Sequence, residues 1–258
     1  MKKKENSDLL SSVPKPSYVI LAAGGLSQRM GGINKLMAKV GNRTVLWRST
    51  QIFWQHPGIA GLVVVGHEEY LPEYQAELAS FTSLSGEKFL HFCPGGATRA
   101  QSVQKGLLFL QQILQGAPAN VLVHDAARCL LRPQRIDQIL DLLSPHRLVA
   151  VAPARLASDT VVVVGENPRR IDSIPDRSRT WLVQTPQAAD LEVLLEAHAQ
   201  AERMKRVYTD DLTMLSQIGL PIRLIPGDAD NIKVTSQEDL PLAEYLLQHQ
   251  LDLGIACP

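Results

Sequence analysis

The sequence predicts an α/β fold, in which a mostly parallel sheet carries helices on both faces and a β-hairpin arm projects from it. Short apolar runs alternate with segments of helical periodicity along most of the chain. These runs are apolar throughout, which is typical of parallel strands that helices cover on both faces. One pair of strand-like runs, within residues 160–174, has no helix between its members and interrupts the alternation.

The elements of the first half follow in order. We expect strands at residues 18–22, 62–65, 89–92, 121–123 and 148–151. Helices are expected between them at 45–55, 70–80, 99–115 and 134–143. Ligands bind beyond the carboxyl ends of the strands in such a sheet, so the loops after the first, third and fourth strands together predict a site.

The irregular segment predicts the hairpin arm. Residues 160–164 are apolar, residues 165–168 form a turn rich in Gly, Asn and Pro, and the chain returns over residues 169–174. Such an arm exposes an apolar edge, and a second copy of the chain is the simplest cover for it. The alternative is an antiparallel edge pair folded back on its own domain. Beyond the arm we expect helices at 188–201 and 209–219, a strand at 222–225 and a last helix from about Ser236.

Length and composition restrict the class of protein. The 258 residues fit a single domain at 17–248, with the arm at about 157–180, between a flexible N-terminal tail at 1–16 and a C-terminal tail at 249–258. The 26 basic and 26 acidic residues cancel, which gives no electrostatic case for nucleic acid or an anionic membrane. No run approaches the roughly 20 apolar residues of a membrane span. Three scattered cysteines fit a reducing cytosol, so we expect a cytoplasmic protein with a small-molecule partner.

The loop after the first strand, residues 24–32, is a candidate phosphate-binding segment. Its glycines let backbone N–H groups approach a ligand closely, and Arg29 and Lys35 supply positive charge for an oligophosphate. The spacing matches neither the Walker A loop nor the dinucleotide fingerprint. The alternative is a tight turn between a strand and a helix that carries two solvated cations.

Cations and small polar groups also gather at the other predicted strand ends, without any nucleophile motif. Such a set suits phosphoryl or nucleotidyl transfer, because the substrate brings its own nucleophile and the protein positions the reactants and stabilises developing charge. The candidates are Arg29, Lys35, Arg99, Ser102, Asp125, Arg128, Thr160, Arg177, Thr185 and Lys233.

Several motifs appear in a fixed order. They are the glycine loop, Gly-Gly-x-x-Arg-x-x-Ser-Val-x-x-Gly-Leu at 95–107, Val-His-Asp-Ala-Ala-Arg at 123–128, Asp-Thr at 159–160, Gln-Thr-Pro-Gln at 184–187, Thr-Asp-Asp at 209–211 and Asp-Asn-Ile-Lys-Val-Thr at 230–235. Together they resemble the 2-C-methyl-D-erythritol 4-phosphate cytidylyltransferase family of the non-mevalonate isoprenoid pathway, from about residue 18 to 244. The resemblance implies a Rossmann-like nucleotidyltransferase fold, a homodimer clasped by an exchanged arm, and Mg²⁺. It also implies transfer of CMP from CTP to 2-C-methyl-D-erythritol 4-phosphate, with release of pyrophosphate.

The resemblance further implies a role for each matching residue. Lys35 and Arg29 are expected to stabilise the transition state at the α-phosphorus. The residues expected around the cytidine are Ala22, Ala23, Gly24, Gly96 and Ser102. The residues expected on the sugar-phosphate side are Asp125, Arg128, Thr160, Thr185 and Lys233, with Arg177 reaching the substrate of the partner subunit. No acidic pair stands out, so the metal ligands stay open and Mg²⁺ is expected to be held chiefly by the triphosphate.

Two departures from the family pattern keep rival functions open. The family has Ala-Ala-Gly-x-Gly-x-Arg-Met and a proline before the catalytic lysine, whereas this loop is similar to that of molybdenum-cofactor guanylyltransferases. Cys129 replaces a proline after the Val-His-Asp-Ala-Ala-Arg motif. The rivals are a ribitol 5-phosphate or other sugar-phosphate cytidylyltransferase, a guanylyltransferase, and a non-catalytic nucleotide-binding protein with the same fold.

Overall fold

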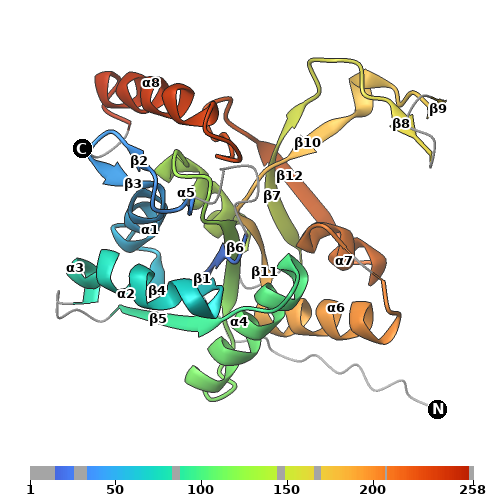
Figure 1. Cartoon of the computed structure of the whole chain (residues 1–258). Helices are drawn as coiled ribbons and strands as arrows, with labels where there is room; N and C mark the ends of the chain where they lie inside the picture. Colours follow the sequence, from blue (N-terminus) through green and yellow to red (C-terminus); the bar gives the residue numbers. More distant parts are fainter. Residues whose placement is uncertain are drawn as a thin grey trace, which may run out of the picture.

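The structure is a computed structural model that describes residues 15–25, 34–82, 88–143, 149–165, 170–206 and 208–255. Its centre is an eight-stranded sheet in the order β10-β7-β11-β6-β1-β4-β5, in which β12 also pairs with β7 (Figure 1). The strands are β1 (Ser17–Ala23), β4 (Ile59–Gly66), β5 (Phe89–Pro94), β6 (Asn120–Asp125), β7 (Ala150–Leu156), β10 (Trp181–Val183), β11 (Gln187–Asp190) and β12 (Ile222–Pro226).

Most of the pairings in this sheet are parallel. β5, β4, β1 and β6 run side by side in the same direction, and β12 runs parallel to β7. β10 and β11 run antiparallel to β7, and β11 also runs antiparallel to β6. The mostly parallel sheet is therefore confirmed, with two antiparallel strands that the apolar pattern did not predict.

β11 corrects the helix that the sequence predicts from residue 188. Ala188 and Ala189 favour helices, but both are fully buried and pair with β6, so tertiary context overrides their propensity. The helix begins only at Leu191, because the Asp190 side chain accepts hydrogen bonds from the backbone N–H groups of Glu192 and Val193.

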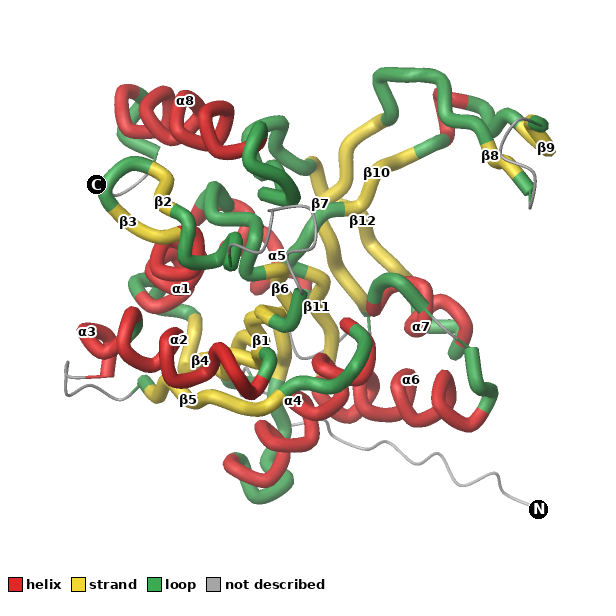
Figure 2. Tube along the Cα trace, in the orientation of Figure 1, coloured by secondary structure: helices red, strands yellow, loops and turns green. Residues whose placement is uncertain are grey.

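Helices cover both faces of the sheet (Figure 2). They are α1 (Val45–Trp54), α2 (Leu71–Glu77), α3 (Ala79–Thr82), α4 (Arg99–Ile113), α5 (Pro133–Leu142), α6 (Leu191–Arg203), α7 (Asp211–Gln217) and α8 (Asp239–Asp252). Alternate residues of β1 divide between two cores. Val19 and Leu21 belong to a core with α1, α2, α5 and α8, whereas Tyr18 and Ile20 belong to a core with α4, α6 and α7. Burial on both faces explains why the strand is apolar throughout.

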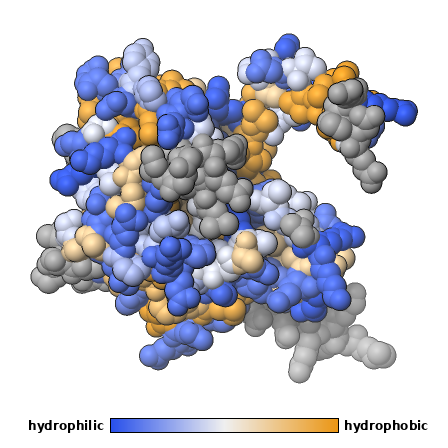
Figure 3. Space-filling model, viewed as in Figure 1, coloured by the Kyte–Doolittle hydropathy of each residue, from blue (hydrophilic) through white to orange (hydrophobic). Residues whose placement is uncertain are grey.

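The hairpin arm is formed by β8 (Val163–Val164) and β9 (Ile171–Ser173), which pair antiparallel in a small sheet of their own. It extends away from the main body, as predicted, and does not fold back on the central sheet (Figure 1). Apolar side chains gather along it (Figure 3), and Ile171 is 53% and Ile174 60% exposed.

The chain ends differ in part from the predicted tails. Residues 1–14 lie outside the described residues, but the carbonyl of Pro16 already accepts a hydrogen bond from Asn120 N at the start of β6. α8 continues to Asp252, so residue 249, the predicted start of the C-terminal tail, is still within a helix. The cause is Gln250, which is buried and donates hydrogen bonds to Leu130 O and Asp230 Oδ2.

The last two helices begin later than predicted, α7 at Asp211 instead of 209 and α8 at Asp239 instead of 236. In α8, the carboxylate of Asp239 accepts hydrogen bonds from the backbone N–H groups of Thr235 and Ser236, which holds these two residues in a turn.

Within the described residues, no helix has the length and apolarity to cross a membrane.

Candidate active site

A cavity of about 390 Å³ lies beyond the carboxyl ends of β1 and β6. Its walls come from the end of β1 and the glycine loop, from the start of α4, from the end of β6, and from the loop before α8. The lining includes Ala22, Ala23, Gly24, Gly25, Lys35, Leu36, Ala97, Thr98, Arg99, Ser102, Asp125, Ala127, Lys233 and Thr235. The fold thus gathers at one place many of the residues that the sequence singles out, as expected for the carboxyl edge of a parallel sheet.

Lys35 stands at the glycine loop. A Cβ atom added at Gly25 would lie at ordinary contact distance, 3.5 Å, from Lys35 Nζ, so the ammonium lies directly beside the backbone of the loop. The loop is tied at both ends to α2, since the hydroxyl of Tyr74 lies 3.3 Å from Asn34 Oδ1 and 3.5 Å from Ala23 O. Arg29 lies outside the described residues, and its predicted role stays a prediction.

The start of α4 closes one side of the cavity. Gly96 N donates a hydrogen bond to Ser102 Oγ at 3.0 Å, and the Ser102 hydroxyl donates to Thr98 O at 2.9 Å. A Cβ at Gly24 would lie 3.2 Å from Ser102 Oγ, and a Cβ at Gly95 only 2.7 Å. A Cβ at either glycine would therefore press on Ser102, so side chains larger than that of glycine are disfavoured where β1, the 95–98 turn and α4 meet.

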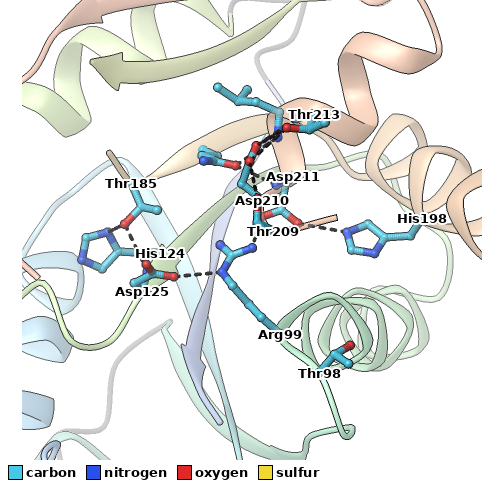
Figure 4. A network of polar contacts seen from close by, with 12 residues as sticks. Thr98, Arg99, His124, Asp125, Thr185, His198, Thr209, Asp210, Asp211 and Thr213 are labelled. Carbon is cyan, nitrogen blue, oxygen red and sulfur yellow. Dashed lines mark hydrogen bonds and ion pairs between the residues drawn. The ribbon is translucent and has the colours of Figure 1, made fainter. Parts of the chain in front are cut away.

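Asp125, the last residue of β6 and the register partner of Ala22 on β1, is the centre of a second wall (Figure 4). Its Oδ1 accepts a hydrogen bond from Arg99 Nε at 3.0 Å, and its Oδ2 accepts one from Lys233 Nζ at 2.7 Å. Burial alone would raise the pKa of Asp125, but the charges of Arg99 and Lys233 hold it well below its usual range. The wall therefore presents an ionised carboxylate between two cations.

Thr185 and His124 lie behind Asp125 and support it (Figure 4). Asp125 N donates to Thr185 Oγ1 at 3.1 Å, and Thr185 Oγ1 lies 3.0 Å from His124 Nδ1. His124 Nε2 lies 2.9 Å from Arg128 O, which can only accept, so Nε2 carries the proton and Nδ1 accepts from Thr185. Burial lowers the pKa of His124 to about 4, which keeps the ring neutral. Thr185 is thus a buried support of the wall and does not line the cavity.

The other predicted substrate residues divide into two groups. Arg128 lies just behind the wall, with Nε 3.9 Å from Asp125 Oδ2 and Nη1 donating to Asn231 O at 2.8 Å. Thr160 and Arg177 are exposed on the arm, and Arg177 Nη1 donates to Ser158 O at 3.2 Å. The structure therefore does not bring these two arm residues to the cavity of their own chain.

Sequence reasoning assigned no role to two residues that complete the polar network. Asp211 binds Arg99 from the side away from Asp125, and His198 on α6 binds Asp211 in turn (Figure 4). The Thr-Asp-Asp motif at 209–211 was a signal for Asp211. His198 carried none, because a histidine within an amphipathic helix gives no indication of its partner.

The carboxylates offer little for a metal ion. Among the described residues no group of three or more His, Cys, Asp or Glu side chains could hold one. Asp125 is the one carboxylate in the described lining of the cavity, and Arg99 and Lys233 already engage its oxygens.

Comparison with known proteins agrees with this geometry. The family model for 2-C-methyl-D-erythritol 4-phosphate cytidylyltransferase matches residues 17–249. This chain belongs to that family. The 2-C-methyl-D-erythritol 4-phosphate cytidylyltransferase of Trichodesmium erythraeum is 32% identical over 231 residues, which cover 89% of this chain and 97% of the relative. The resemblance drawn from the motifs is therefore confirmed.

Solved structures agree as well. The 2-C-methyl-D-erythritol 4-phosphate cytidylyltransferase of Thermus thermophilus has a TM-score of 0.67 at 29% identity, covering 91% of this chain and 99% of that one. The 4-diphosphocytidyl-2C-methyl-D-erythritol synthase of Anaerococcus prevotii has a TM-score of 0.76 at 24% identity, covering 91% of this chain and 97% of that one. The second likeness supports the fold alone, and the expected nucleotidyltransferase architecture is confirmed.

Proposed function

We propose that this protein transfers CMP from CTP to 2-C-methyl-D-erythritol 4-phosphate, giving 4-CDP-2-C-methyl-D-erythritol and pyrophosphate. The observation that carries the proposal is the cavity, in which a glycine loop with Lys35 faces the ion pair of Asp125 and Lys233, in a cytidylyltransferase-family chain. A triphosphate and a phosphorylated polyol are the ligands that these two walls suit.

The reaction needs no nucleophile from the protein. A phosphate oxygen of the polyol phosphate attacks the α-phosphorus of CTP, the new P–O bond forms, and the bond to the bridging oxygen of the β-phosphate breaks. Pyrophosphate carries away the electron pair of that bond. Lys35, at the end of the glycine loop, stabilises the negative charge that develops on the α-phosphate oxygens, and Arg29 is proposed to act beside it.

The nucleotide lies, in this proposal, on the wall of Ala22, Ala23 and Gly24. Backbone groups there and at Gly96, together with Ser102, pair with the edge of the cytosine base. The proposed pocket takes a pyrimidine in preference to a purine. Buried polar groups left unpaired by the wrong base would reject it.

The polyol phosphate lies, in this proposal, beside the ion pair of Asp125 and Lys233. The Asp125 carboxylate accepts hydrogen bonds from the polyol hydroxyls, and Lys233 binds the phosphate as a point charge. Arg128 adds a second cation behind the wall, and Thr185 acts by fixing the backbone of Asp125. We include Mg²⁺ as the metal: it would be held chiefly by the substrate phosphates and would neutralise their charge, because Arg99 and Lys233 already engage the oxygens of the one carboxylate in the described lining.

We also propose a homodimer in which each arm covers the cavity of the partner. The exposed apolar side chains of the arm support this pairing, since an apolar strand edge in water is a liability that a second copy removes. Thr160 and Arg177 would then complete the partner's polyol-phosphate site. The buried free thiols of Cys93 and Cys129 suit the cytosol as the compartment.

The test is release of pyrophosphate from CTP by the purified protein with a panel of polyol phosphates. We expect turnover with 2-C-methyl-D-erythritol 4-phosphate and little with ribitol 5-phosphate, erythritol 4-phosphate or no acceptor. GTP and ATP in place of CTP, and EDTA in place of Mg²⁺, test the base and the metal separately. A preference for ribitol 5-phosphate would replace the acceptor, and release with no polyol phosphate at all would contradict the transfer.

A further inference from the structure

A chain of ion pairs runs from the cavity into the core behind it, and its inner half takes no part in the reaction proposed above (Figure 4). Arg99, the first residue of α4, lies between two carboxylates. Its Nε donates to Oδ1 of Asp125 at 3.0 Å, and its Nη1 donates to Oδ2 of Asp211 at 2.8 Å. Oδ1 of Asp211 lies 3.0 Å from Nε2 of His198. The chain of contacts therefore connects α6, α7 and α4 to the end of β6.

Asp211 lies out of reach of any ligand. Its side chain is 0% exposed, and it is not among the residues that line the cavity. Its backbone is held too, since Asp211 N and Leu212 N both donate to Oε1 of Gln187. Burial alone would raise the pKa of Asp211, but the hydrogen bond from His198 and the charge of Arg99 bring it below its ordinary value. Asp211 is thus a fixed, ionised carboxylate inside the protein.

Stability alone gives a weak reason for such a group. The cost of removing two charges from water offsets most of their attraction, so buried ion pairs are often no more stable than apolar side chains of similar volume. What the carboxylate of Asp211 does supply is a direction for the guanidinium of Arg99. A planar guanidinium and a carboxylate favour two parallel hydrogen bonds when nothing else restrains them.

Arg99 does not form such a bidentate pair with Asp125. Its Nη1 is engaged by Asp211, its Nη2 is buried without a hydrogen-bond partner, and only Nε reaches Asp125. Oδ2 of Asp125 is therefore left for Lys233, at 2.7 Å on the cavity side. The hydrogen bond between Arg99 and Asp211 thus restricts how the guanidinium can meet the carboxylate of Asp125.

We propose that Asp211 is a positioning residue that orients Arg99 and, through it, the carboxylate of Asp125 and the ammonium of Lys233. The inference rests on the proposed function in assigning Asp125 and Lys233 to the polyol phosphate. Without Asp211, Arg99 turns to take both oxygens of Asp125 and displaces Lys233. Misplacement of a reacting group by about 1 Å can lower a rate about 10²-fold.

The first test compares Asp211→Asn with the matched control Asp210→Asn. Asp210 is half-buried at the same end of α7 and accepts from Thr213 N, a capping role that asparagine retains. We expect Asp211→Asn to lower kcat/KM for 2-C-methyl-D-erythritol 4-phosphate about 10²-fold, with little change in KM for CTP. The control keeps the kinetics of the unmodified protein. A folded Asp211→Asn protein with unchanged kinetics overturns the proposal.

A second pair of variants guards against misfolding of Asp211→Asn. They are Arg99→Gln and the double variant Arg99→Gln with Asp211→Asn, and the double variant leaves neither charge of this buried pair without its partner. If Asp211 acts through Arg99, the two proteins have the same kinetic constants, because the second change removes nothing further. An additional loss of kcat/KM in the double variant means that Asp211 acts by another route, and it overturns the proposal.

A readout without activity separates this inference from the proposed function. The Nε–H of Arg99 gives a ¹⁵N NMR signal that is identified by its loss in Arg99→Gln. We expect Asp211→Asn to shift this signal and Asp210→Asn to leave it in place, and an unchanged signal in Asp211→Asn overturns the inference. If the unmodified protein does not transfer CMP, the proposed function fails while this measurement still decides the role of Asp211.

Discussion

The ammonium of Lys233 lies 2.7 Å from Oδ2 of Asp125, although the two residues stand 108 positions apart in the chain. Asp125 ends β6, and Lys233 lies in the loop before α8, which is fixed beside β6 where Val234 N donates to Ala127 O at 2.9 Å. The fold thus sets a carboxylate and an ammonium side by side at the cavity. One polyol phosphate can engage both.

Lys233→Met is expected to weaken binding of the polyol phosphate. A hydrogen bond to a charged group contributes about 1.5–3 kcal/mol, so KM for 2-C-methyl-D-erythritol 4-phosphate should rise about 10- to 100-fold. KM for CTP should change little, because Lys233 is paired with Asp125 and is not among the residues proposed to hold the nucleotide. The same substitution at the exposed Lys205 is the control. Equal increases in both KM values would contradict the assignment of the two walls.

Lys35→Met is expected to reduce turnover itself. Removal of one preorganised donor to developing charge typically costs about 2.7–4 kcal/mol, or about 10²–10³ in kcat. Lys39, exposed four residues later, is the matched control. Steady-state kinetics and thermal unfolding of both variants check the prediction, and near-normal turnover in a folded Lys35→Met protein would remove Lys35 from the proposed mechanism.

The sequence indicated the sheet well where burial is uniform. β1, β4 and β6 appear as apolar runs because both faces of each strand are covered. β11 could not be predicted in the same way. Two alanines within a helix-like stretch become a strand only because β6 and β7 lie on either side of them, and this is a property of the whole sheet.

The residues of the site also differ in how much the sequence reveals about them. Lys35, Asp125 and Lys233 stand at strand ends or in loops, where an unusual residue type is visible in the sequence. Thr185 also stands out, but the sequence does not reveal that it is buried behind Asp125. The partnership of Arg99 with Asp211 joins residues 112 positions apart, and local pattern carries no information on such pairs.

Ser102→Ala is expected to weaken binding of CTP. The substitution removes the acceptor of the Gly96 N–H and so loosens the turn that forms the pyrimidine pocket. One neutral hydrogen bond contributes about 0.5–1.5 kcal/mol, which corresponds to a rise in KM for CTP of about two- to tenfold. KM for the polyol phosphate should stay unchanged. Parallel assays with GTP test the pocket, and equal use of GTP and CTP by the unmodified protein would require a different site for the base.

The buried His124 predicts how stability depends on pH. Burial lowers the pKa of its imidazole to about 4, whereas in the unfolded chain the ring takes up a proton near about pH 6.5. Between these values the unfolded state binds more protons, so stability falls as the pH drops through this window. The loss attributable to this group is about 2 kcal/mol by about pH 5.

His124→Asn tests this origin, because the amide oxygen can replace Nδ1 as the acceptor of the Thr185 hydroxyl and does not titrate. Denaturant unfolding of both proteins at about pH 7.5 and about pH 5 gives the two losses. We expect the variant to lose less stability than the unmodified protein between these conditions. Identical losses would show that the pH dependence comes from other groups.

The arm residue Arg177 is expected to serve the partner subunit. In its own chain it is exposed on the arm, its Nη1 donates to Ser158 O, and it does not line the cavity. If two copies exchange arms, a symmetric dimer brings each Arg177 to the cavity of the other copy. Arg177→Ala should then raise KM for the polyol phosphate or lower turnover, because a charge-assisted contact with phosphate is lost. The neighbouring Arg179→Ala is the control and should have a smaller effect.

Mixing two impaired proteins decides whether the site is shared. A heterodimer of Lys35→Ala and Arg177→Ala subunits contains one cavity with both defects. Its other cavity has neither defect, because Lys35 belongs to the cavity of its own chain and Arg177 comes from the partner. Under conditions in which subunits exchange, activity should therefore rise above that of either variant alone. Exchange is verified with differently tagged copies, and no gain in spite of it would mean that Arg177 serves its own subunit or neither.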